Sequence, residues 1–103
     1  MTTRADAREL ARMLLALMAA ARRPACAVLT RVDDPLGRSV GHSLEVCEAL
    51  DVLHGGGDTG LRDLALELVN TLLELTGFEP SLHPREALRS GAAYERFAAL
   101  VRA

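Results

Sequence analysis

Apolar residues recur at steps of three and four along the first part of the chain, which is the spacing of one helix face. Thr3 precedes this stripe as a capping residue, and Asp6 stands in the first turn, where a carboxylate favours the amino end. We predict a helix from about residue 4 to residue 22. Its stripe consists of Leu10, Met13, Leu14, Leu17, Met18 and Ala21.

The next apolar run has a different pattern. Pro24 ends the helix, and the run from Ala25 to Leu29 is apolar at every position. A strand that is buried on both faces has this pattern, and such strands belong to parallel sheets covered by helices. The segment 78–82 contains Pro80 and fits an edge strand at best. The run at 25–29 is therefore expected to find its partner strands in another chain or in another part of a longer sequence.

The rest of the chain predicts helices separated by glycine and proline. The expected segments are 43–53, which ends at the glycines 55–57; about 59–76, which Asp58 or Thr59 caps and Gly77 ends; a short helix opened by Pro84; and a last one through Tyr94 and Val101. The inward positions of the first two are expected to be Leu44, Cys47, Leu50, Leu53, Leu61, Leu64, Ala65, Leu68, Leu72 and Leu75. The predicted fold class is a mainly helical α/β fragment of about five helices and one buried parallel-type strand.

Composition changes this picture little. Half of the 103 residues are hydrophobic and the net charge is −2, so we expect a globular protein that attracts neither nucleic acid nor acidic membranes. The apolar stretch at 13–21 is too short for a membrane span, and no targeting segment is visible. Cys26 and Cys47 lack metal-site spacing, which predicts buried, reduced thiols and a cytoplasmic location.

Most of the candidate chemistry has an ordinary structural explanation. His42, His54 and His83 occupy separate turns or helix ends without metal spacing and are read as solvated side chains. The glycines 55–57 could cradle a phosphate, but Asp58 would repel an anion there, which favours a plain helix terminator. No serine lies in a nucleophile motif. The sequence therefore predicts no catalytic residue.

The turn from Asp33 to Gly41, with Glu48 beyond it, is the one arrangement that could do more than pack. Irregular backbone frees carbonyl oxygens, and a nearby carboxylate can join them around a hard cation. The alternative is a simple strand-to-helix connection with a solvated glutamate.

The residues of this region resemble a known family. PLGRSVGHSLEVCEAL, from Pro35 to Leu50, follows DAREL at residues 6–10 and AVLT at residues 27–30, and GAAYERFAALV closes the chain. Together these segments are similar to the pyrimidine-nucleoside phosphorylases of the thymidine phosphorylase type. The resemblance covers almost all of the chain, and it implies part of the family's α/β domain.

The resemblance implies a reaction in which phosphate attacks the anomeric carbon of a pyrimidine nucleoside, giving the base and a pentose 1-phosphate. It assigns the phosphate-binding and base-binding motifs to the part of the family that precedes the segment resembled here. We therefore expect residues 1–103 to form a partial α/β domain, without the amino-terminal catalytic part and the carboxyl-terminal domain. No catalytic or substrate-binding residue is assigned to this chain.

One site carries over by position. Family members hold potassium or calcium partly through two backbone carbonyls after this strand and a glutamate in the following helix, and the matching positions are Leu36, Ser39 and Glu48. The resemblance thus implies a metal contribution in an intact enzyme, with no cofactor required for the chemistry.

Three hypotheses follow for the chain by itself. The first is an inactive phosphorylase fragment. The second is one subunit of a split phosphorylase, partnered by an upstream fragment or by another copy, with phosphate and pyrimidine nucleoside bound only in the complete enzyme. The third is a repurposed helical interaction module.

Overall fold

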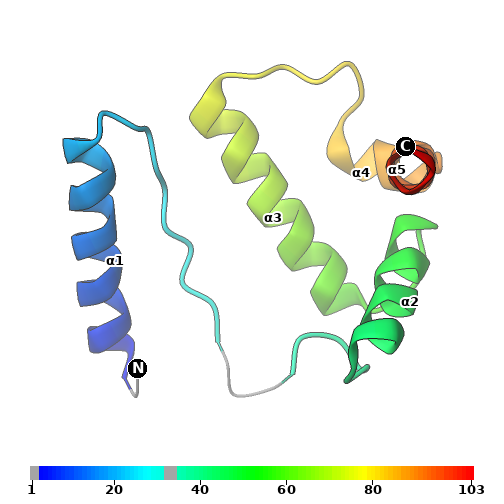
Figure 1. The fold of residues 1–103 in the computed structure, drawn as a ribbon, viewed down its shortest axis with the longest axis horizontal. Helices are drawn as coiled ribbons and strands as arrows, with labels where there is room; N and C mark the ends of the chain where they lie inside the picture. The colour runs from blue at the N-terminus through cyan, green and yellow to red at the C-terminus, as the bar shows by residue number, and fades with distance from the viewer. Residues whose placement is uncertain (1–2, 32–34) are drawn as a thin grey trace.

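The computed structural model describes residues 3–31 and 35–103, and it is built of helices joined by irregular segments (Figure 1). The mainly helical prediction is confirmed, with five helices in the expected order. They are α1 (Arg4–Ala20), α2 (His42–Leu53), α3 (Thr59–Thr76), α4 (Pro84–Arg89) and α5 (Ala92–Arg102).

Local capping interactions fix most of the helix ends. The Thr3 hydroxyl accepts the N–H of Asp6 at 3.1 Å at the start of α1. The Asp58 carboxylate accepts the N–H of Leu61 at 3.0 Å at the start of α3. Gly77 ends α3 with φ of 64°, a left-handed conformation that glycine adopts without a steric penalty. These ends agree with the prediction because the groups that form them are neighbours in sequence.

The predicted strand is wrong. No residue in 3–31 or 35–103 is in a strand, and the run from Ala25 to Leu29 crosses between α1 and the following turn as irregular chain (Figure 1). A strand exists only when its N–H and C=O groups pair with a second strand, and the described residues supply none. Leu29 is 45% exposed, so the run is not buried either. The edge segment at 78–82 is also irregular, and the start of the predicted turn at Asp33 lies outside the described residues.

Four of the helices pack together while α1 stands apart from them. Helix α4 packs on α5 and on α3, and α2 packs on α5. In Figure 1, α1 lies on the far side of the irregular run from α3. Met13 and Leu17, on its apolar stripe, are 59% and 66% exposed, and no described residue of α1 is buried. Within the described residues, the stripe that predicted α1 is therefore largely exposed.

Few side chains of the other helices are buried. Among the residues that the structure describes, the buried apolar side chains are Val52 in α2 and Leu66 in α3. Several predicted core positions are exposed instead: Leu44, Cys47, Leu68 and Leu72. Cys26 is exposed as well, so the prediction of buried thiols is wrong. The predicted faces are only partly covered within the described chain, where Leu50, Leu53, Leu61, Leu64 and Leu75 are half-buried.

The molecule is also more open than its size predicts. It exposes 8317 Å², whereas a folded monomer of its mass exposes about 5,700 Å². Its radius of gyration is 16.1 Å, against about 13 Å for a compact domain of this length. None of the described helices is long and apolar enough to cross a membrane.

Candidate functional site

The carboxylate of Glu48 holds the turn that precedes α2. One of its oxygens accepts the N–H of Arg38 at 2.7 Å, and the other accepts the N–H of Ser39 at 3.1 Å. Gly37 has φ of 79°, and a Cβ at this position would overlap the same carboxylate. Glu48 is thus more than the solvated glutamate of the simpler interpretation, because it bonds to two successive amides of the turn.

Arg38 extends this network to α3. Its guanidinium Nε lies 3.4 Å from Oδ2 of Asp58, whose other oxygen caps α3. The hydrogen bond from the Leu61 N–H lowers the pKa of the Asp58 carboxyl, and the charge and hydrogen bond of Arg38 lower it further. The side chain of Asp58 is only 19% exposed. The turn, α2 and the start of α3 are therefore joined through two carboxylates.

Two of the three predicted metal-site residues are brought together by this turn. Ser39 and Glu48 are in hydrogen-bond contact, while Leu36 directly precedes Gly37 in the chain and has a side chain that is 55% exposed. Among the described residues, no three His, Cys, Asp or Glu side chains are arranged to hold a metal ion. A cation at this turn would thus need carbonyl oxygens beside Glu48. The metal site stays a prediction.

A hollow of about 370 Å³ lies against the same turn. Glu48, Asp51 and Asp58 contribute carboxylates to its lining, and Arg38 contributes the opposing charge. Because both oxygens of Glu48 already accept N–H groups, a cation there would share them through their remaining lone pairs. Carboxylate oxygens suit a hard cation and not a soft one, and among the described residues no three such side chains are placed to hold one.

Two of the histidines, His54 and His83, make specific contacts with other residues. His54 Nδ1 lies 2.9 Å from the carbonyl oxygen of Leu50, and the ring centroid is 3.9 Å from that of Tyr94. His83 caps α4, where its Nδ1 accepts the N–H of Arg85 at 3.3 Å. Both residues are exposed, as expected of solvated side chains, but each also makes specific contacts. The contacts with Leu50 and Arg85 are local in sequence, whereas the contact of His54 with Tyr94 of α5 depends on how the helices pack.

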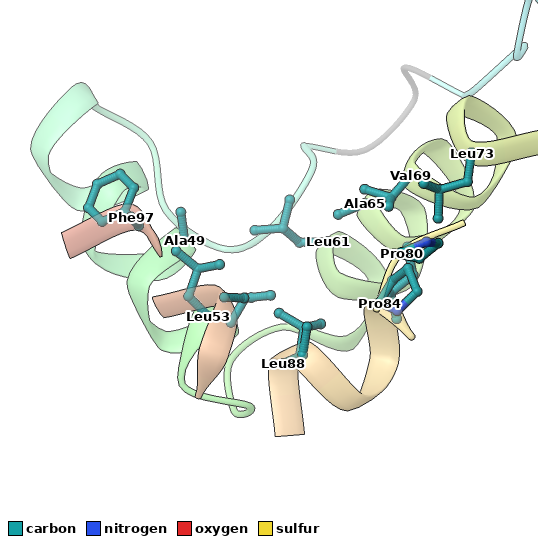
Figure 2. A pocket seen from close by; sticks show the side chains of 14 residues that line it. Ala49, Leu53, Leu61, Ala65, Val69, Leu73, Pro80, Pro84, Leu88 and Phe97 are labelled. Atoms are coloured by element: carbon teal, nitrogen blue, oxygen red, sulfur yellow. The ribbon is translucent and has the colours of Figure 1, made fainter. Parts of the chain in front are cut away.

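A groove of about 480 Å³ lies where α2, α3, α4 and α5 meet, and all of its lining residues are apolar (Figure 2). Figure 2 shows Leu61 and Leu88 extending from α3 and α4 toward this space, with Phe97 of α5 at its other end. The groove offers no charge or hydrogen-bond donor with which to orient a phosphate or a nucleoside. It is the incompletely covered core of the helical cluster.

Two features of the polar surface were missed by sequence reasoning. One is the ion pair of Arg38 with Asp58, and the other is a basic hollow between α3 and α4 that includes Arg62 and Arg85. Asp58 was recognised as a cap, but no local signal links it to a turn that lies before α2. Such pairs depend on how the helices are placed and have no periodic pattern.

Comparison with known proteins gives a consistent set of relatives. The chain is 47% identical over 98 residues to thymidine phosphorylase of Mycobacterium tuberculosis, covering 95% of this chain and 23% of the relative. It is 43% identical over 96 residues to thymidine phosphorylase of Mus musculus, covering 88% and 20%. It is 33% identical over 107 residues to pyrimidine-nucleoside phosphorylase of Staphylococcus aureus, covering 99% and 25%. No family model and no solved structure matches the chain.

These relatives are all named as phosphorylases of nucleosides. The chain is homologous to one segment of the thymidine phosphorylase and pyrimidine-nucleoside phosphorylase family, as its sequence motifs indicated. It spans about a fifth to a quarter of the length of these relatives.

Proposed function

We propose that this chain is a structural segment of a pyrimidine-nucleoside phosphorylase and does not catalyse phosphorolysis by itself. The observation that carries the proposal is a comparison with one relative. Nearly the whole chain aligns with it at 47% identity, yet the alignment covers only 23% of that relative. The reaction that this enzyme would perform is attack of phosphate on the anomeric carbon of a pyrimidine nucleoside, which releases the base and a pentose 1-phosphate.

The chemistry of that reaction supports inactivity of the isolated chain. Phosphorolysis requires phosphate, sugar and base to be held together in one orientation, with charge stabilisation where the glycosidic bond breaks. The apolar groove has no polar group for this task, and the turn held by Glu48 presents mainly carboxylates, which repel phosphate. The family resemblance implies that the phosphate-binding and base-binding motifs belong to other parts of the enzyme.

The open surface favours a segment that works with further protein over a free-standing interaction module. The chain exposes about 2,700 Å² more than a folded monomer of its mass would expose. Obligate assemblies bury areas of this size. We propose that an upstream part of the phosphorylase, on the same chain or on a separate one, covers this surface. In the isolated protein, a second copy of the chain would cover it instead.

We further propose that the turn contributes to a potassium or calcium site in the assembled enzyme. Glu48 would supply a carboxylate oxygen, and Leu36 and Ser39 would supply backbone carbonyl oxygens. The hydrogen bond from the Ser39 N–H to Glu48 supports this proposal only by bringing the residue beside the carboxylate, because it does not involve the Ser39 carbonyl. A cytoplasmic location belongs to the same proposal, because free thiols at Cys26 and Cys47 suit a reducing compartment.

The proposal is tested by assaying phosphate-dependent cleavage of thymidine, uridine and deoxyuridine. The purified chain is expected to show no turnover, and co-expression with an adjacent upstream reading frame that encodes the remaining motifs is expected to restore it. Material from a host without its own phosphorylases is the control. Turnover by the chain alone in that material would overturn the proposal.

A further inference from the structure

A second polar hollow, of about 450 Å³, is lined by Gly55, by Arg62 in the first turn of α3, and by His83 and four residues of α4. Its polar side chains are Arg62, His83, Arg85, Glu86 and Arg89. Three guanidinium groups and one histidine therefore share the hollow with a single carboxylate. Basic side chains outnumber acidic ones here, whereas carboxylates outnumber basic groups in the hollow beside Glu48.

The single carboxylate is already paired. Glu86 accepts two hydrogen bonds from Arg89, at 2.9 Å from Nε and 2.7 Å from Nη2. These bonds, together with the charge of Arg89, lower the pKa of the Glu86 carboxyl. Glu86 and Arg89 thus largely neutralise each other, and because Arg62 is paired with Asp63, the remaining unpaired guanidinium that lines the hollow, among the described residues, is that of Arg85.

Arg62 and Arg85 both keep donors for a ligand. Arg62 uses its Nε on Asp63 at 3.1 Å, which leaves both Nη groups, and its side chain is only 28% exposed. Arg85 makes no ion pair within residues 3–31 and 35–103. Arg62 is already paired with Asp63, so within the described chain the guanidinium that adds an unpaired charge to the hollow is that of Arg85, while Arg62 adds the N–H donors of its two Nη groups.

His83 adds a directed donor. Its Nδ1 accepts the backbone N–H of Arg85, so that nitrogen carries no proton in this arrangement. The proton of the neutral ring is then at Nε2, the other end of the imidazole. His83 lines the hollow, and we include this N–H among the donors to an oxygen acceptor there.

We propose that this hollow binds a phosphate group, as inorganic phosphate or as a small phosphate ester, through Arg62, His83 and Arg85. A planar guanidinium matches two phosphate oxygens at once, and two of them with an imidazole N–H suit a tetrahedral dianion better than a planar carboxylate. The volume exceeds that of phosphate alone, so a sugar-sized ester group fits beside it. The site is separate from the turn at Glu48 and does not depend on the proposed phosphorylase function.

Isothermal titration calorimetry of the full chain with inorganic phosphate, ribose 5-phosphate and acetate at constant ionic strength tests the proposal. We expect saturable binding of one or both phosphate ligands. The ligand that binds more strongly shows whether the hollow prefers inorganic phosphate or a phosphate ester. Arg85→Gln is expected to weaken binding about tenfold, the loss of one charge-assisted contact. The affinity of Arg85→Lys is expected to lie between those of the parent chain and Arg85→Gln, because lysine keeps the charge and lacks the planar guanidinium.

The matched control is Arg96→Gln on the exposed side of α5, which should leave binding unchanged. Glu86→Gln should tighten binding, because it removes the opposing carboxylate and releases Arg89. Circular dichroism checks that each variant keeps its helices. Equal affinity in Arg85→Gln and Arg96→Gln, equal affinity for acetate, or no saturable binding of either phosphate ligand would overturn the site.

Discussion

Glu48 and Gly37 form a matched pair at the scale of single residues. The carboxylate of Glu48 occupies the space where a side chain at residue 37 would begin, and it bonds to the two amides that follow. Glycine is therefore required at 37 for two reasons, its positive φ and the contact with Glu48. Backbone amides in an irregular segment have no neighbouring strand to bond to. Here the Glu48 side chain of α2 accepts two of them and so holds the turn.

We expect Gly37→Ala to destabilise the chain by about 2 kcal/mol, of which about 1 comes from the positive φ and the rest from displaced hydrogen bonds to Glu48. Urea unfolding followed by circular dichroism measures the change. Gly77→Ala is the control, because Gly77 also has positive φ but would have no atom near an added Cβ. If the two variants lose equal stability, Glu48 does not hold the turn.

Asp58 predicts a particular pH dependence. Its pKa is lowered from an ordinary value of 3.8, chiefly by the N–H of Leu61 and then by the N–H of Gly60 and by Arg38. A carboxyl whose pKa is lower in the folded state stabilises that state above its unfolded pKa, and this contribution is lost as pH falls through the folded pKa. We expect the stability contributed by Asp58 to be full at pH 6 and to decline below pH 3.8.

Asp58→Asn separates this effect from other carboxyl groups. Asparagine still caps α3 but has no titrating charge and no ion pair with Arg38. Thermal melts between pH 6 and pH 3 should therefore show a smaller loss of stability in the variant than in the parent chain. Parallel losses in both would show that Asp58 does not contribute to the acid dependence.

At the scale of elements, the helices could be predicted and the strand could not, for one physical reason. Helix signals such as Thr3, Asp58 and Gly77 act on groups within a turn of themselves. A strand at Ala25 to Leu29 depends on backbone partners far away in sequence, and the described chain offers none. The same limit explains the site, where the Glu48 position was predicted but its contacts and the ion pair of Arg38 were not.

Burial within the helices shows this limit again. The stripe of α3 was predicted to be inward at Leu68 and Leu72, yet these side chains are 47% and 58% exposed while Leu66 is buried. Periodicity identifies an apolar face, and the neighbours that are present decide which part of it is covered. Leu66 is covered where α3 forms the apolar groove with α2, α4 and α5.

Two substitutions in α3 distinguish these positions. Leu66→Ala is expected to cost about 2–4 kcal/mol in the isolated chain, as removal of a buried leucine does. Leu72→Ala is expected to cost less than about 1 kcal/mol, because most of its side chain is already in water. Chemical denaturation of dilute protein gives both values. A larger loss for Leu72→Ala would mean that α3 packs through the opposite face.

At the scale of the whole molecule, exposed apolar surface is the dominant property. The stripe of α1, the run at 25–29 and the outer face of α3 are all exposed or only half-buried. Each large aliphatic side chain left in water forfeits roughly 1.5–3 kcal/mol, so a few of them rival the 5–15 kcal/mol that stabilise a typical domain. The chain by itself should therefore be helical but only marginally stable.

We expect the purified chain to self-associate, with helical circular dichroism and a broad thermal transition. Val28→Lys, in the irregular run, is expected to improve solubility and to prevent assembly with an upstream phosphorylase fragment, because a charge there opposes burial. Size-exclusion chromatography with light scattering measures the mass. A monomer with a sharp transition would show that the helices cover these surfaces unaided.

A chimeric enzyme tests the central claim most directly. The segment of Mycobacterium tuberculosis thymidine phosphorylase that is 47% identical to this chain is replaced by the corresponding residues of this chain. If the chain is a structural segment of such an enzyme, the chimera should cleave thymidine only when phosphate is present, at a rate within about tenfold of the parent. A chimera that folds to the size of the parent but shows no phosphate-dependent cleavage would contradict the account.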